Sequence, residues 1–235
     1  MTVRFLSAAL AMTILSACSQ GQKARNSTMQ TALDSVSYAI GADIGANLKR
    51  GQMDSLNVDL MAAGLQDGMD STVKMDAEQL RTVMQSYMSK LEAKRMAAEQ
   101  AEGEANRVAG EEFLAENGKR KGVVTTPSGL QYEVITMGTG PKPTEADQVK
   151  VHYVGTLIDG TTEFDSSVRR GEPAVFGLNQ VIRGWVEGIQ LMPVGSKFKF
   201  FIPSDLAYGP SAPPGSEIKP NSTLVFDVEL LEIVK

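Results

Sequence analysis

The residues best suited to form a binding site surround Trp185, the single tryptophan of this 235-residue chain. The stretch 181–189 reads VIRGWVEGI, and Ile182, Trp185 and Ile189 recur in it at the spacing of one helix face. Because glycine has no Cβ, the two glycines of this stretch allow a neighbouring element to approach the helix backbone closely. Aromatic residues of the strand-like segments around it can complete an apolar pocket with Trp185 as its base.

Groups that could attack a substrate or hold a metal are scarce, because the chain contains one cysteine and one histidine. One cysteine cannot form an internal disulfide, and one histidine without a second thiol provides no zinc constellation. The formal net charge of -5 does not supply the basic surface that nucleic-acid binding needs. We therefore expect a globular chain of one or two domains that uses no metal and no cofactor and binds no nucleic acid.

The N-terminus has the pattern of a secretory signal. Residues 1–17 contain one early arginine and then an apolar run that is too short to span a membrane. The run ends LSAC, which resembles the lipobox of bacterial lipoproteins, in which the cysteine is lipidated and becomes the mature N-terminus. We expect Cys18 to be a lipid anchor, residues 18–31 to be a flexible tether, and the protein to be held in the bacterial envelope facing the periplasm. The alternative is a plain signal peptide with a chance cysteine.

Residues 32–118 read as helical. Asp34 is expected to cap a first helix, and Asn57 or Asp59 a second, and each helix carries an apolar stripe and two glycines. Neither helix is long enough to bury its stripe alone. We expect the two helices to pack on each other or on a second copy of the chain, which makes 32–118 a dimerisation domain.

A third, long helix is expected from Asp76 to Asn117, with Asp76 as its cap and Gln79 three residues on as in a capping box. Its apolar stripe thins after Leu91 to alanines among charged and amide residues, until Val108, Phe113 and Leu114. A helix that is polar on all sides usually connects domains through solvent. The alternative is a helix that breaks at Gly103 or Gly110 and folds back.

From residue 122 to 235 the chain has the texture of strands and turns. Apolar and polar residues alternate in 148–158, 198–202 and 224–230, and an Asp-Gly pair at 159–160 signals a hairpin. These segments predict an antiparallel sheet with one dry face, which the short tryptophan helix covers. The fold class is therefore α+β, with helices first and the sheet second.

Five motifs of this second half resemble those of FKBP-type peptidyl-prolyl cis-trans isomerases in order and approximate spacing. They are HYVG at 152–155, FDSS at 164–167, VIRGW at 181–185, AYG at 207–209 and LVFDVELL at 224–231. The resemblance covers residues 123–235, about half of the chain. The helical half is similar to the N-terminal dimerisation domain of the macrophage-infectivity-potentiator and periplasmic branch of this family.

The resemblance implies which residues form the site. Asp165, Tyr208 and Tyr153 take the catalytic positions. The substrate-binding positions fall on Phe164, Arg170, Phe176, Val181, Ile182, Trp185, Ile218 and Phe226. His152 belongs to a matching motif, but the alternation of its strand points it away from Tyr153, so we expect it to be structural.

The implied activity is isomerisation of X-Pro bonds in unfolded or nascent envelope proteins, by a homodimer that uses no covalent chemistry. The family's macrolide ligands are implied as binders of the same pocket. A dimeric holdase-type chaperone, with isomerase activity secondary, is the alternative, and the sequence does not rank the two.

Overall fold

The computed structural model describes residues 28–53, 55–213 and 215–234. The expected signal peptide, Cys18 and most of the tether lie outside the described residues. The contacts within the chain divide it into two compact units, Met1–Leu91 and Glu92–Lys235, which are described separately. The expected domain limits of 32–118 and 122–235 are therefore not the limits of these units, and they stay a prediction about independent folding.

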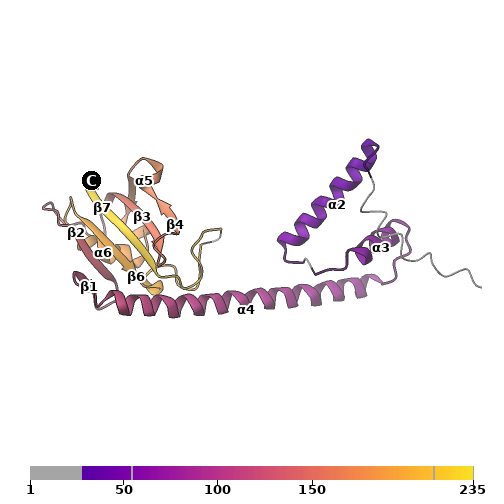
Figure 1. The fold of residues 1–235 in the computed structure, drawn as a ribbon, viewed down its shortest axis with the longest axis horizontal. Coiled ribbons are helices and arrows are strands. Elements are labelled where there is room, and N and C mark those ends of the chain that lie inside the picture. Colours follow the sequence, from indigo (N-terminus) through magenta and orange to yellow (C-terminus); the bar gives the residue numbers. More distant parts are fainter. Residues whose placement is uncertain (1–27, 54, 214, 235) are drawn as a thin grey trace, which may run out of the picture. The chain divides into compact units, whose positions relative to one another are not determined.

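The N-terminal unit contains helices α2 (Ala32–Arg50) and α3 (Val58–Met69) and the start of α4 (Ala77–Asn117), which continues into the second unit (Figure 1). Asn57 caps α3 by accepting the amide of Leu60 at 3.1 Å, as one of the two expected alternatives. Asp34 is not the N-cap of α2, contrary to the expectation, because Thr31 takes that position. The Asp34 carboxylate lies three residues further on and accepts the Thr31 amide at 2.9 Å, which completes a capping box.

Neither α2 nor α3 buries a residue within the described part of the chain. Their large apolar side chains are instead exposed, namely Leu33, Val36, Tyr38, Ile40, Ile44, Val58, Leu60, Leu65 and Met69. Single exposed apolar residues are ordinary, but an exposed apolar set of this size on two short helices calls for a covering partner.

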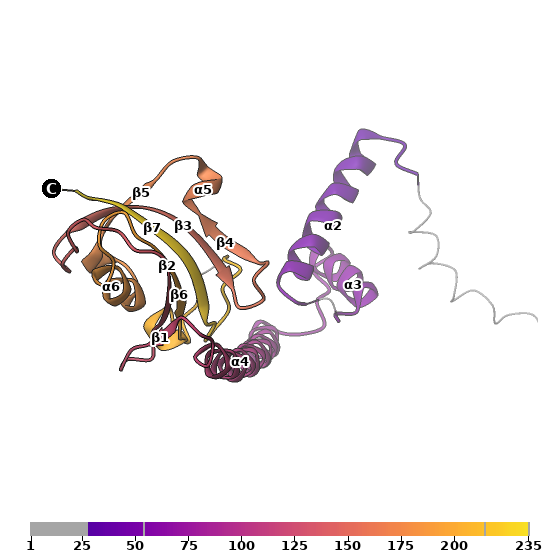
Figure 2. The same cartoon turned by 60° about the vertical axis from the view of Figure 1, so that its left-hand side comes forward.

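The second unit contains an antiparallel sheet that curves around helix α6 (Figure 2). The strand order is β1-β2-β6-β7-β3-β4, and β5 pairs with the first half of β3. Leu157 and Thr162 close the expected hairpin between β3 and β4 with an N–H···O bond of 2.9 Å. The strands are β1 (Val123–Thr125), β2 (Gln131–Thr136), β3 (Gln148–Leu157), β4 (Glu163–Ser166), β5 (Ala174–Gly177), β6 (Lys197–Ile202) and β7 (Leu224–Val234).

Helix α6 (Arg183–Gln190) covers the dry face of the sheet, and two glycines let it approach closely. A Cβ at Gly184 would lie 2.5 Å from Cγ2 of Ile202, and one at Gly188 would lie 2.6 Å from Cε1 of Phe200. Both distances are far inside van der Waals contact, so the prediction that these glycines permit close approach is confirmed. The helix begins two residues later than expected, with Ile182 as its N-cap.

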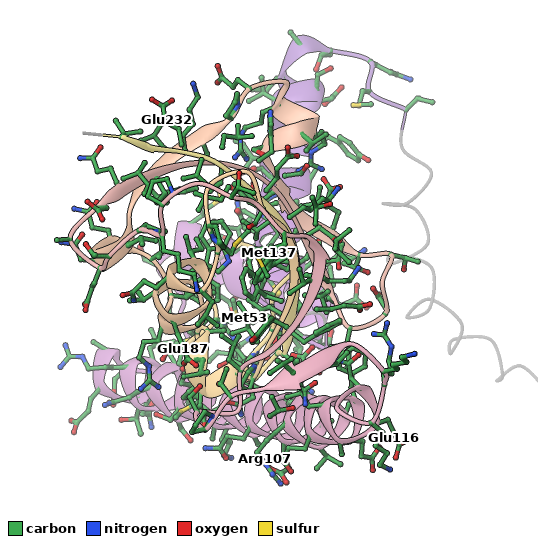
Figure 3. All side chains as sticks on the ribbon, turned by 90° about the vertical axis from the view of Figure 1, so that its left-hand side faces the viewer. Met53, Arg107, Glu116, Met137, Glu187 and Glu232 are labelled. Carbon is green, nitrogen blue, oxygen red and sulfur yellow. The ribbon has the colours of Figure 1, made fainter. Side chains whose placement is uncertain are left out.

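The second half of α4 is not surrounded by solvent, contrary to the expectation of a helix polar on all sides. Gly103, Gly110 and Asn117 are buried, and the amide of Asn117 donates to Gln131 Oε1 at 2.8 Å. These buried contacts are made by small residues and an amide, which a search for an apolar stripe does not detect. Arg107 lies on the outer side of the helix, where it pairs with two glutamates (Figure 3).

The helix α4 runs without interruption over 41 residues, so the alternative of a break at Gly103 or Gly110 is excluded. Among the described residues, no helix combines the length and the apolar character needed to cross a membrane.

Candidate active site

A pocket of about 620 Å³ opens between the sheet and the loops around α6. This volume lies in the range of small-ligand sites. The expected site residues meet here: all of them except Arg170 line the pocket, namely Tyr153, Phe164, Asp165, Phe176, Val181, Ile182, Trp185, Tyr208, Ile218 and Phe226. They come from four strands, one helix and two loops, so only the fold brings them together.

Aromatic rings packed edge to face form the floor of the pocket. The Trp185 ring centroid lies 5.2 Å from that of Tyr153 and 5.2 Å from that of Phe226, at interplanar angles of 86° and 75°. Phe176 packs on the same indole at 5.5 Å, and Phe164 packs on Phe226 at 5.4 Å. Such edge-to-face contacts hold the rings rigidly and leave an apolar surface for a ligand.

Three polar side chains form a closed hydrogen-bonded cluster at one edge of the pocket. The Tyr153 hydroxyl donates to Asp165 Oδ2, and Arg170 donates to Asp165 Oδ1. Arg170 also donates to the Tyr153 oxygen at 2.8 Å, with its guanidinium carbon 5.5 Å from the ring centroid. Arg170 thus lies behind the pocket wall and contacts the lining residues instead of the cavity.

The cluster fixes the protonation of its members. Burial works against ionisation of Asp165, but hydrogen bonds from Tyr153 and Arg170 outweigh it and lower the pKa of the carboxyl below its usual 3.8. Burial, aided by the nearby Asp165 carboxylate, raises the pKa of both Tyr153 and Tyr208 above the usual 10.0. At neutral pH the pocket therefore presents one carboxylate and two neutral phenols.

Helix α5 (Ser167–Arg170) places Arg170, and Ser167 attaches this helix to β3. The buried Ser167 hydroxyl accepts the Tyr153 amide at 2.7 Å, and it lies 3.1 Å from Nδ1 of His152. His152 does not line the pocket. Its contact is with the residue that positions α5, in agreement with the expected structural role.

Three further lining residues were not among the expected site residues: Gln180, Pro213 and Ser216. Gln180 directly precedes Val181, and the other two lie in the loop between Tyr208 and Ile218. Their proximity in the chain to expected site residues was the available signal, because their residue types alone do not indicate a pocket. Among the described residues, no group of three or more His, Cys, Asp or Glu side chains could hold a metal ion.

A curved antiparallel sheet on one short helix, with an aromatic pocket edged by an Asp–Tyr–Arg cluster, defines a binding site for a compact apolar group next to a polar one. This is the class of the prolyl isomerases with an FKBP fold. Two family models match the chain: "FKBP-type peptidyl-prolyl cis-trans isomerase" over residues 140–231, and "Domain amino terminal to FKBP-type peptidyl-prolyl isomerase" over residues 33–134. The chain belongs to the FKBP-type peptidyl-prolyl cis-trans isomerases.

Known proteins of this family resemble the chain over most of its length. An FKBP-type isomerase, FkpA, of Aeromonas hydrophila is 52% identical over 204 residues, which cover 84% of this chain and 75% of the relative. The outer membrane protein MIP of Legionella longbeachae is 46% identical over 88% of both chains. The crystal structure of FkpA from Escherichia coli matches with a TM-score of 0.73 at 38% identity, over 88% of this chain and 98% of that one. The α+β fold expected from the sequence is confirmed by these matches.

Proposed function

We propose that this isomerase acts on X-Pro bonds in the pocket floored by Trp185, by binding the twisted amide without covalent chemistry. The observation that carries this proposal is the apolar aromatic cavity beside the Asp165 cluster, with the Tyr208 hydroxyl at its rim. Among the residues that the structure describes, none of those lining the pocket is a cysteine, histidine or lysine. Binding therefore has to supply the rate enhancement.

Rotation of a peptide bond passes through a twisted state in which the amide resonance is lost, against a barrier of about 18–20 kcal/mol. In that state the carbonyl is less polar than in the planar amide, so it loses less hydration free energy on leaving water. An apolar cavity therefore binds the twisted state more tightly than the planar one. Only this difference in affinity lowers the barrier, since equal binding of both states does not.

The polar residues would orient the substrate. The Trp185 indole and its aromatic neighbours offer a flat apolar surface for the proline ring. The Tyr208 hydroxyl, which bonds to no other described residue, is free to donate to a substrate carbonyl. Asp165 holds its charge next to the cavity while Tyr153 and Arg170 occupy its oxygens, so it stabilises the pocket wall and sets the local field.

The test compares two carboxylate substitutions in a protease-free isomerisation assay on short X-Pro peptides. Asp165→Ala removes the pocket carboxylate, and we expect kcat/KM to fall by at least tenfold. The matched control is Asp227→Ala, because Asp227 also pairs with a cation, Lys199 at 3.1 Å, but does not line the pocket. A folded Asp165→Ala protein with the rate of the Asp227→Ala control would refute the proposed site. The macrolide ligands of the family are proposed for the same pocket and should compete with the peptide.

We further propose that the protein is a homodimer through α2, α3 and the start of α4. The support is the exposed apolar set on α2 and α3, which nothing in the described chain covers. Burial of one such side chain contributes about 1.5–3 kcal/mol, so a few per subunit can offset the entropy of association. Two pockets on one dimer would also suit a holdase-type chaperone. In that case an Asp165→Ala dimer should still suppress aggregation of an unfolded client while its isomerase activity is lost.

The envelope location is proposed from the sequence motif at Cys18 and from the relative that is named an outer membrane protein. Lipidation of Cys18 would anchor the protein to a membrane, facing the periplasm. Expression of the full chain and of Cys18→Ser in a Gram-negative host tests this. The parent should fractionate with membranes and carry lipid by mass spectrometry, and Cys18→Ser should be released. Equal fractionation of the two proteins would count against the anchor.

A further inference from the structure

One side of the pocket depends on the loop between Tyr208 and Asn221. The two ends of this loop meet at one place, which we call the loop base. Tyr208 precedes this loop, and Pro213, Ser216 and Ile218 within it line the cavity. The loop closes where the amide of Asn221 donates to the carbonyl oxygen of Gly209 at 2.8 Å. Because Gly209 directly follows Tyr208, whatever fixes Asn221 also fixes the start of the loop.

Other hydrogen bonds of the loop are short-range. Ser216 Oγ donates to Pro213 O at 3.0 Å, and its oxygen accepts the amide of Ile218 at 3.2 Å. Bonds of this kind keep the loop compact but do not set its orientation relative to the sheet. Its orientation therefore depends on the packing of Ile218 into the core and on what holds the base.

Two side-chain amides, one from α4 and one from the loop, connect helix α4 to the loop base. Asn106 Nδ2 donates to the carbonyl oxygen of Pro220 at 3.0 Å, and Asn221 Nδ2 donates to the carbonyl oxygen of Gly103 at 3.2 Å. These bonds join positions 114 and 118 residues apart in the chain. Asn221 has a φ of 56°, in the left-handed region that asparagine tolerates better than most residues. Asn221 thus bonds to the loop start through its backbone and to α4 through its side chain.

Two glycines bring the helix close enough for these bonds. A Cβ at Gly103 would lie 3.1 Å from Cβ of Pro220, and one at Gly110 would lie 2.2 Å from Oγ1 of Thr223. Any side chain at Gly110 would push α4 and the start of β7 apart. Glycine in a helix interior costs about 1 kcal/mol relative to alanine, so the helix itself gains nothing from having glycine there.

We propose that Gly103, Asn106 and Gly110 of α4 are positioning residues for the isomerase pocket, acting through the loop base at Pro220–Asn221. The second half of α4 is then a support of the active site and not only a connector. This inference rests on the proposed role of the pocket. It goes further because it assigns part of the substrate affinity to residues that do not touch the cavity.

The test uses the full chain and two independent changes. Asn106→Asp keeps the shape of the side chain but replaces its donor with an acceptor that faces the Pro220 carbonyl. Ala109→Asp is the control, because it adds the same charge to an exposed position of the same helix. We expect Asn106→Asp to lower kcat/KM roughly fivefold, the scale of one lost hydrogen bond, and to weaken proline-peptide binding followed by Trp185 emission by a similar factor. Ala109→Asp should change neither.

The second change is Gly110→Ala, alone and with Thr223→Ala. The single substitution should weaken peptide binding, and the double substitution should restore it in part, because the Thr223 hydroxyl is the nearest obstacle. Circular dichroism and urea unfolding accompany each variant, since a purely structural role would lower the unfolding midpoint without changing the affinity of the folded protein.

The outcomes separate the two proposals. Unchanged affinity and kcat/KM in both folded Asn106→Asp and folded Gly110→Ala, with activity lost in Asp165→Ala, would overturn the positioning role and leave the pocket intact. Full activity in Asp165→Ala would remove the pocket proposal itself. Should Asn106→Asp fail to fold, the Gly110 pair decides the matter, and a Gly110→Ala protein with parental affinity overturns the inference.

Discussion

Replacing Gly188 by alanine should destabilise the sheet domain even though alanine is the better helix former. A Cβ at this position would lie 2.6, 2.9 and 3.0 Å from three atoms of the Phe200 ring. Phe200 is fully buried, so its rigid ring has no free space to move into. Overpacking of a core costs about 1–3 kcal/mol, and three close contacts with one ring place this case near the upper end. The gain in helix propensity is about 1 kcal/mol, so we expect a net loss of about 2 kcal/mol.

The assay is urea unfolding of the full chain followed by tryptophan emission. Because Trp185 is the single tryptophan and is 4% exposed, its emission reports the unfolding of this domain and not of the N-terminal helices. The Gly188→Ala/Phe200→Leu variant completes the cycle. Its loss of unfolding free energy should be smaller than the sum of the losses of the two single variants by at least about 1 kcal/mol, because the leucine removes the ring that the new methyl group contacts. A Gly188→Ala protein as stable as the parent, or strictly additive losses, would refute the close-packing argument.

Three further predictions concern pH, association and domain limits. Isomerase activity should be constant from about pH 5 to 9, because the lowered pKa of Asp165 keeps it ionised and the raised pKa values of Tyr153 and Tyr208 keep them neutral. Because the pKa of Asp165 is lower in the folded protein, its ionised carboxylate stabilises the fold above pH 3.8, and this stabilisation is lost as the pH falls through the lowered pKa. Activity and stability should therefore decline together only in acid. A midpoint near pH 6 in the activity profile would contradict this assignment. The chain from residue 28 should sediment as a dimer at micromolar concentration and Ile40→Glu/Ile44→Glu as a monomer, whereas a monomeric parent would rule out the apolar interface. A fragment that starts at Glu92 should unfold at a higher urea concentration than one that starts at Lys121. The shorter fragment lacks the packing of Phe113 on Phe201 at 6.0 Å and the Asn117–Gln131 hydrogen bond. Equal midpoints would show that the residues from 122 onward are sufficient for the full stability of the domain.

Strands and the pocket helix could be predicted because their side chains follow simple periods. Alternation in β3, β6 and β7 identifies the buried face, and the glycines of α6 imply a close neighbour before that neighbour is known. The capping box at Asp76 and Gln79 is equally local, and both of its bonds are present at 3.0 and 2.8 Å. Signals of this kind depend on residues within a few positions of each other.

The hydrogen bonds between α4 and the loop base could not be predicted, because their acceptors are groups that every sequence contains. The carbonyl oxygens of Gly103 and Pro220 accept the decisive bonds, and a backbone carbonyl leaves no trace in a residue pattern. Arg170 is a related case. The family resemblance placed it among the substrate-binding positions, but only the geometry of α5 shows that it contacts Asp165 and Tyr153 from behind the pocket wall.

The position of β7 in the sheet has a consequence for how this domain forms during synthesis. β7 lies between β6 and β3 and follows both in the chain, and its pairing with β3 joins residues as distant as Gln148 and Val234. Until β7 has been made, the pair β2–β6 and the group β3–β4–β5 share no strand and cannot close over α6. Loop closure of this length slows folding, so the emerging chain exposes two half-sheets with unpaired edges. The nascent domain is therefore prone to aggregate until β7 joins the two half-sheets.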